Sequence, residues 1–105
     1  MLRIYDVVIG ILTDLRPVIG QLERRDADLS RQIRRASVSV ALNIAEGSGS
    51  RGKNRTVRYH SALGSMRETI ACIEVGVAMG YLERPSDEIV DRMHRVIATL
   101  ARLVR

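Results

Sequence analysis

Aliphatic side chains recur every three or four residues along almost the whole chain, and this spacing constrains the fold more than any other feature. An α-helix gathers such residues on one face, whereas a strand places successive side chains on opposite faces. Runs that alternate with period two are few, so the pattern predicts an all-α protein. The row of the first predicted helix, residues 3–24, consists of Tyr5, Val8, Leu12, Leu15, Ile19 and Leu22, widened by Ile4, Ile11 and Val18.

Turn and cap signals divide the chain into four helices. Asp26 or Asp28 can cap a second helix that runs to about Glu46, with Gly47 as its left-handed C-terminal cap. A third helix is expected over residues 53–80, and Ser86 is expected to cap the fourth. The residues predicted to face the core are Leu29, Ile33, Ala36, Val40 and Ile44 in the second helix, Tyr59, Ala62, Leu63, Met66, Ile70, Ile73 and Val77 in the third, and Ile89, Met93, Val96, Leu100 and Leu103 in the fourth.

The connections between these helices are short, which predicts a single domain over residues 1–105. Four helices so joined fold as an antiparallel, up-down-up-down four-helix bundle. The core is expected to be aliphatic, because the chain has three tyrosines and no phenylalanine or tryptophan. Pro17 lies inside the first helix, where it predicts either a kink or the end of the helix. The Gly/Ser-rich residues 48–54 are expected to form a flexible, basic connection.

Two helices carry a second apolar row on the side away from the core. A small bundle buries one side of each helix, so a helix that is apolar on both sides predicts a subunit interface. The chain is therefore expected to form a homo-oligomer. The interface residues are predicted to be Val38, Leu42 and Ala45 in the second helix and Cys72, Val75 and Met79 in the third.

Positive charge is concentrated in residues 31–58, which hold seven basic residues and one acidic residue. Residues 1–30 hold four basic and five acidic residues and residues 59–105 hold six of each, so this segment accounts for the net charge of +5. Segregated positive charge favours binding to the phosphates of RNA or DNA, with contacts that weaken as salt rises. A solvated face and salt bridges to a neighbouring subunit or an acidic partner are the alternatives. The basic residues are Arg31, Arg34, Arg35, Arg51, Lys53, Arg55 and Arg58.

Catalytic and metal-binding patterns are not found. Residues 47–53 are glycine-rich but lack the order of a phosphate-binding loop, and Asn54 stands where that loop has Ser or Thr. His60 and His94 have no partners at metal-ligand spacing, and Cys72 has no catalytic partner motif, which favours a packing role. We therefore expect no enzyme activity, no cofactor and no metal. A single cysteine and the lack of a leader or membrane-spanning stretch indicate a cytoplasmic protein.

Two polar residues near the end of the second helix are expected to be structural. Asn43 lies at the edge of the core face, where a hydrogen bond is its expected role. Glu46 is the only acid among seven bases, which favours an ion pair with a nearby arginine.

Residues 32–52 read QIRRASVSVALNIAEGSGSRG, and this stretch resembles a known family. The family comprises small bacterial four-helix-bundle proteins encoded in intervening sequences of large-subunit ribosomal RNA genes. Gln32, Asn43, Glu46 and Gly47 belong to the family signature, and further matching pieces extend the resemblance over about residues 29–83. Related members are accessory proteins of diversity-generating retroelements. The resemblance thus implies a ring-like homopentamer that binds RNA or DNA and assists a reverse transcriptase.

Overall fold

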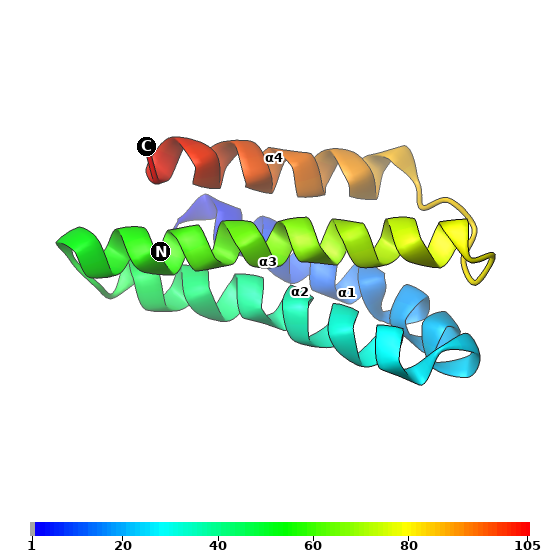
Figure 1. The fold of residues 1–105 in the computed structure, drawn as a ribbon. Helices are drawn as coiled ribbons and strands as arrows, with labels where there is room; N and C mark the ends of the chain where they lie inside the picture. The colour runs from blue at the N-terminus through cyan, green and yellow to red at the C-terminus, as the bar shows by residue number, and fades with distance from the viewer. Residues whose placement is uncertain (1) are drawn as a thin grey trace.

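The computed structural model describes residues 2–105, and all regular secondary structure within them is helical. The four helices are α1 (Arg3–Arg25), α2 (Ala27–Ser48), α3 (Gly52–Ala78) and α4 (Asp87–Leu103) (Figure 1). Their number and order confirm the all-α prediction, and each begins and ends within a few residues of the predicted bounds. None of the helices within residues 2–105 combines the length and apolar character needed to cross a membrane.

A single residue, Asp26, connects α1 to α2. Its backbone N–H donates to the carbonyl of Leu22 over 2.7 Å, which closes α1. Its carboxylate accepts from the backbone N–H of Leu29 over 3.0 Å, which caps α2. Asp26 is therefore the cap and Asp28 is not, and the connection between the two helices is this one residue.

Pro17 does not end the first helix. α1 continues through it to Arg25, so of the two alternatives left open by the sequence, the end of the helix at Pro17 is excluded. Leu15 and Leu22 are both fully buried on either side of the proline, and their packing holds both halves of the helix against the core. The hydroxyl of Ser30 in α2 donates to the carbonyl of Ile19 over 3.1 Å and fixes the second half of α1 further.

The core is aliphatic, as the composition predicts, and every helix contributes to it. Leu103 is an exception to the predicted pattern, since its side chain is 41% exposed. It is the last residue of α4 and lies beyond that helix's last fully buried residue, Leu100, so its neighbours cover only part of it. The large side chains that are buried almost completely are Val8, Ile11, Leu15, Leu22, Ile33, Val40, Ile44, Met66, Met93, Val96 and Leu100.

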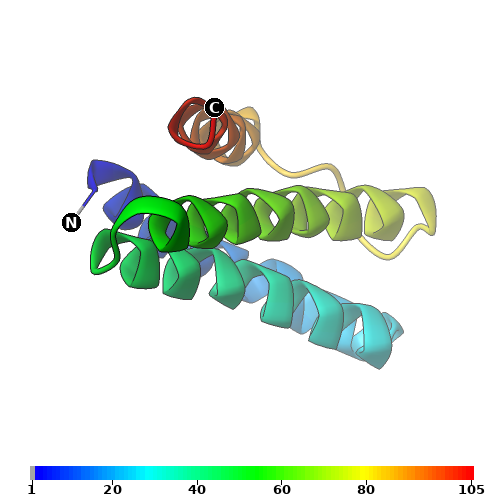
Figure 2. The same cartoon turned by 60° about the vertical axis from the view of Figure 1, so that its left-hand side comes forward.

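Helix α4 is attached to the other three by packing and by one arginine. Ser86 caps it as predicted, accepting from the backbone N–H of Ile89 over 3.3 Å. Figures 1 and 2 together show that α4 is inclined to α3. Arg92 pairs with Asp14 on α1 and lies 3.7 Å from Glu88, and its side chain is 19% exposed. This half-buried arginine therefore links α4 directly to α1.

Candidate functional site

The basic segment becomes two separate groups when the chain folds. Arg31, Arg34 and Arg35 lie in the first half of α2, and we call them the α2 arginines. Arg51, Lys53, Arg55 and Arg58 lie in the connection and the first turns of α3, and we call them the end group. At 1.5 Å per residue, about 20 Å of α2 separates Arg35 from the connection, while Arg58 of the end group lies back along α2, 3.8 Å from Glu46. The sequence predicts one basic site, whereas the structure distributes the charge along the length of a helix.

An open groove of about 590 Å³ runs along α2 between these groups. At its centre are Val38 and Leu42, whose side chains are 41% and 60% exposed. They continue the row that begins with Arg31 and Arg35, because positions i, i+4, i+7 and i+11 share one face of a helix. The groove is lined by Arg31, Arg34, Arg35, Val38, Ser39, Leu42, Asn43, Glu46 and Arg58.

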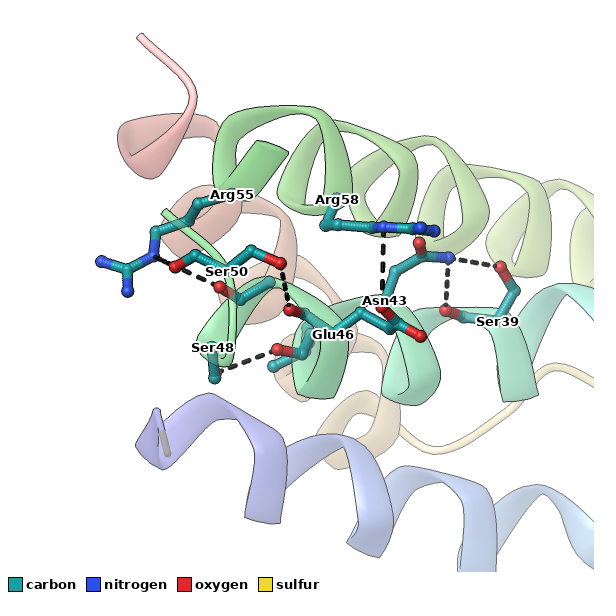
Figure 3. Close-up of polar contacts among 9 residues, drawn as sticks. Ser39, Asn43, Glu46, Ser48, Ser50, Arg55 and Arg58 are labelled. Carbon is teal, nitrogen blue, oxygen red and sulfur yellow. Dashed lines mark hydrogen bonds and ion pairs between the residues drawn. The ribbon is translucent and has the colours of Figure 1, made fainter. Parts of the chain in front are cut away.

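Three of the seven basic residues form ion pairs with acids of the same chain. Arg31 pairs with Asp28, Arg34 lies 3.5 Å from Glu23 on α1, and Arg58 lies 3.8 Å from Glu46 (Figure 3). The last pair confirms the ion pair expected for Glu46. All six side chains are about half exposed or more, so each pair contributes little and can exchange for another anion.

The other four basic residues make no ion pair within residues 2–105. They are Arg35, Arg51, Lys53 and Arg55. The segment therefore retains positive charge that the folded chain itself does not neutralise.

The connection between α2 and α3 is held by hydrogen bonds, contrary to the flexible connection expected from its glycines and serines. It comprises only residues 49–51. The Nε of Arg55 donates to the carbonyls of Gly47 (3.2 Å) and Ser50 (3.0 Å), and the hydroxyl of Ser50 donates to the carbonyl of Glu46 over 2.8 Å (Figure 3). The carbonyls of Glu46 and Gly47 also accept from the backbone N–H groups of Gly49 and Ser50, so the connection is tied to the last turn of α2 and Arg55 is held against it.

Gly47 is not the left-handed cap that the sequence predicts. α2 continues to Ser48, and the capping residue is Gly49 with a φ of −89°. Gly47 is buried, and a Cβ atom there would lie 2.7 Å from the Cδ1 atom of Tyr59 and closer still to Cε1. The signature glycine therefore allows the Tyr59 ring of α3 to pack directly on the backbone of α2. Sequence periodicity places Tyr59 on the core face but does not reveal this contact.

Asn43 has the structural hydrogen bonds expected of it. Its amide nitrogen donates to the carbonyl and to the hydroxyl of Ser39, both over 3.0 Å (Figure 3). The hydroxyl of Ser65 in α3 donates to the same Ser39 hydroxyl over 2.9 Å, so this polar chain joins α2 to α3. Gln32 is exposed, and no side-chain hydrogen bond within residues 2–105 involves it.

The predicted second apolar row is exposed at most of its positions. Val38 and Leu42 lie in the groove. Val75 in α3 and Met79, which follows α3 as its C-terminal cap, are 49% and 59% exposed. Ala45 is half-buried.

Cys72 was expected in this row, but its side chain is only 4% exposed and belongs to the core. Thr69 and Gly76, one turn before and one turn after Cys72, are also buried, so all three lie on the side of α3 that packs against the bundle.

The thiol of Cys72 is expected to be unreactive in the folded protein. Burial, and secondarily the carboxylate of Glu68, raises its pKa, so the thiolate that reacts with alkylating agents is scarce near pH 8. Alkylation by iodoacetamide, followed by mass spectrometry, should be at least about tenfold slower in buffer than in guanidinium chloride. Equal rates in the two conditions would place Cys72 at the surface, in agreement with the sequence pattern.

The connection that follows α3 is acidic. Glu83, Asp87, Glu88 and Asp91 lie in it and in the start of α4 with one base, Arg84, and Arg25 of α1 lies over its Tyr81 ring, 5.5 Å from the ring centroid. α3 has 27 residues and is therefore about 40 Å long, close to the 42 Å length of the molecule. The end group and the acidic residues thus lie at opposite ends of the bundle.

Comparison with known proteins identifies a family and a fold. The model of the family described as 23S rRNA-intervening sequence protein matches residues 3–103. The chain is similar to the crystal structure of a protein with unknown function, of the S23 ribosomal protein family, from Bacteroides thetaiotaomicron VPI-5482. The TM-score is 0.87 at 18% sequence identity, with 97% of this chain and 98% of that chain covered. No curated protein matches the sequence. At this identity the likeness to the solved structure shows the fold alone.

Proposed function

The chain belongs to the family of 23S rRNA-intervening sequence proteins, and we propose that it is a non-enzymatic protein that binds nucleic acid through residues 31–58. The observation that carries this proposal is the groove along α2, whose lining includes four arginines and a single carboxylate. The phosphate groups that such a groove would hold are common to RNA and DNA, so the proposal covers both.

The electrostatic state of the arginines supports phosphate binding. Guanidinium groups hold phosphate oxygens with two parallel hydrogen bonds, and those of the α2 arginines and Arg58 are exposed enough to reach them. The ion pairs to Glu23, Asp28 and Glu46 are solvated and weak, so a polyanion can displace these acids. Contacts of this kind hold the nucleic-acid backbone and carry little sequence preference.

Removing the α2 arginines is expected to lower the salt dependence of binding. We would titrate labelled single-stranded RNA and duplex DNA with the wild type and with the variant Arg31→Gln, Arg34→Gln, Arg35→Gln at several salt concentrations. Losing three phosphate contacts reduces the log–log salt slope by about 2 for a single strand and by nearly 3 for a duplex.

The matched control removes three exposed arginines outside the segment: Arg84→Gln, Arg95→Gln, Arg105→Gln. It carries the same net charge as the α2 variant and should keep nearly the wild-type slope. Equal losses in the two variants would show a general charge effect, and a wild type that binds neither ligand at low salt would contradict the proposal.

The finer architecture is part of the proposal. We take the bundle to be antiparallel, because one, three and eight residues are too few to join neighbouring helices that run the same way. A ring-like homo-oligomer is supported by the exposed apolar side chains of Val75 and Met79, and light scattering would give its mass. A reverse transcriptase as partner stays a prediction drawn from the resemblance.

A protein-interaction scaffold is the second candidate. It is favoured by the same exposed apolar residues, and the acidic end of one copy offers partners for arginines of another. In that case Arg34→Glu with Arg35→Glu would break the oligomer, and the wild type would show no salt-sensitive binding to nucleic acid.

A further inference from the structure

The apolar centre of the groove lies between positive charges. Arg31 and Arg35 precede Val38 and Leu42 in one row of α2, and Arg58 of α3 lines the far end of the groove. The row from residue 31 to residue 46 is about 22 Å long. A polyanion held by the arginines at both ends therefore has to cross the two apolar side chains.

The groove is a strip along one face of α2. Eight of its nine lining residues belong to α2, and the ninth is Arg58 of α3. A ligand that contacts the whole strip has to follow the row of residues 31–46. A flexible single strand can adapt to this row, whereas a duplex stays stiff over such a length, since its persistence length is about 50 nm.

The apolar floor also favours a single strand. In a duplex the faces of the bases are stacked on one another, whereas a single strand exposes them. Proteins that bind single strands combine a positive groove for the backbone with side chains, most often aromatic, against which the base faces pack. Val38 and Leu42 are aliphatic, and they are 41% and 60% exposed, so their free surface offers an apolar contact for base faces without aromatic stacking.

We infer that the α2 groove binds single-stranded nucleic acid, with phosphates on Arg31, Arg34, Arg35 and Arg58 and base faces on Val38 and Leu42. This inference rests on the proposed function and adds the form of the ligand. It assigns Val38 and Leu42 to the ligand instead of to the subunit contact expected from the sequence, and it leaves Val75 and Met79 for self-association.

The test compares Val38→Ser with Leu42→Ser against a control at an equally exposed site. Val57 is 60% exposed on α3 and does not line the groove, so Val57→Ser is the matched control. Fluorescence anisotropy would follow labelled strands of about 12 nucleotides, as RNA and as DNA, and the duplex of the same sequence. All three substitutions are at the surface and should leave the fold intact, which circular dichroism checks.

The double variant should bind the single strand roughly tenfold more weakly and the duplex as before, because base contacts are lost and phosphate contacts are kept. Its salt slope should equal that of the wild type. Separate affinities for the RNA and DNA strands identify which of the two is preferred.

Three results would overturn the inference: a duplex bound as tightly as the single strand, an unchanged affinity in the double variant, or a smaller oligomer in that variant by light scattering. In each case the α2 arginine variant still tests the proposed function separately. If the salt dependence of binding falls in the α2 arginine variant while the Val38→Ser, Leu42→Ser variant binds the single strand as tightly as the wild type, the proposed nucleic-acid binding stands. Only the inferred preference for a single strand is then wrong.

Discussion

Replacing Gly47 by alanine is expected to lower the free energy of unfolding by about 2 kcal/mol, although alanine is the better helix former. Alanine gains about 1 kcal/mol in helix propensity at an interior position. Its Cβ, however, would lie well inside contact distance of the Tyr59 ring, which is rigid and itself 4% exposed. Overpacking of this kind costs about 3 kcal/mol at the upper end of its usual range, which exceeds the gain.

Denaturant unfolding of Gly47→Ala and Gly64→Ala would measure this difference. A Cβ at Gly64, inside α3, meets nothing within 4 Å, so that variant should be more stable by about 0.5–1 kcal/mol. For a chain of this size the loss at Gly47 corresponds to about 10 °C in Tm. Adding Tyr59→Leu to Gly47→Ala should recover part of the loss. A Gly47→Ala protein as stable as Gly64→Ala would mean that the glycine is not required by the ring.

Truncating Leu100 to alanine is expected to lower the free energy of unfolding by about 2–5 kcal/mol, the range for deleting a fully buried leucine. Leu100 has no exposed surface and lies with Met93 and Val96 on the buried face of α4. The neighbouring layers can collapse only partly into the space left behind, so a cavity adds to the lost transfer energy.

Leu103 provides the control, since it is the same residue type one turn further along the same helix. Its side chain is 41% exposed, and Leu103→Ala should cost less than about 1 kcal/mol. If Leu100→Ala does not fold, the milder Leu100→Val keeps the comparison possible. Equal losses at the two positions would favour the sequence prediction, in which both leucines face the core.

The local features of the fold could be predicted because their signals are local. Helical periodicity locates the four helices, and Asp26 and Ser86 cap their helices through backbone groups three residues away. Pro17 leaves two alternatives open for the same reason: its penalty is local, while the packing of Leu15 and Leu22 that keeps the helix continuous is not visible in the immediate sequence.

The sequence predictions for Gly47, Cys72 and Leu103 are wrong because the role and burial of these residues depend on contacts between helices. Gly47 has the sequence context of a helix cap, but its role is set by Tyr59, which reaches it only after the chain has turned. Cys72 and Leu103 show that periodicity gives the direction of a side chain without showing how far the neighbouring helices cover it.

The candidate site was predictable in its composition and not in its geometry. Counting charges identifies all seven basic residues, but only the fold reveals their separation along α2. The same holds for their ion-pair partners: the sequence identifies a partner that is near in the chain and misses one that comes from another helix. Glu46 lies within the segment and was recognised as an ion-pair partner, whereas Glu23 reaches Arg34 from α1 and was not.

The end group lies at one end of a 42 Å molecule and the acidic residues of the α3–α4 connection lie at the other, which contributes an electric dipole along the long axis that Arg25 and the α2 arginines partly offset. At low ionic strength a distant polyanion exerts a torque on such a dipole and turns the basic end toward itself before contact. At physiological salt the Debye length is about 8 Å, so the two ends then act independently and the acidic end no longer opposes binding at the other. Salt thus weakens the final phosphate contacts, and it also removes the electrostatic orientation of the protein before contact. Because the length of α3 sets the distance between the two charged ends, it also sets the size of this effect on the rate of association at low salt.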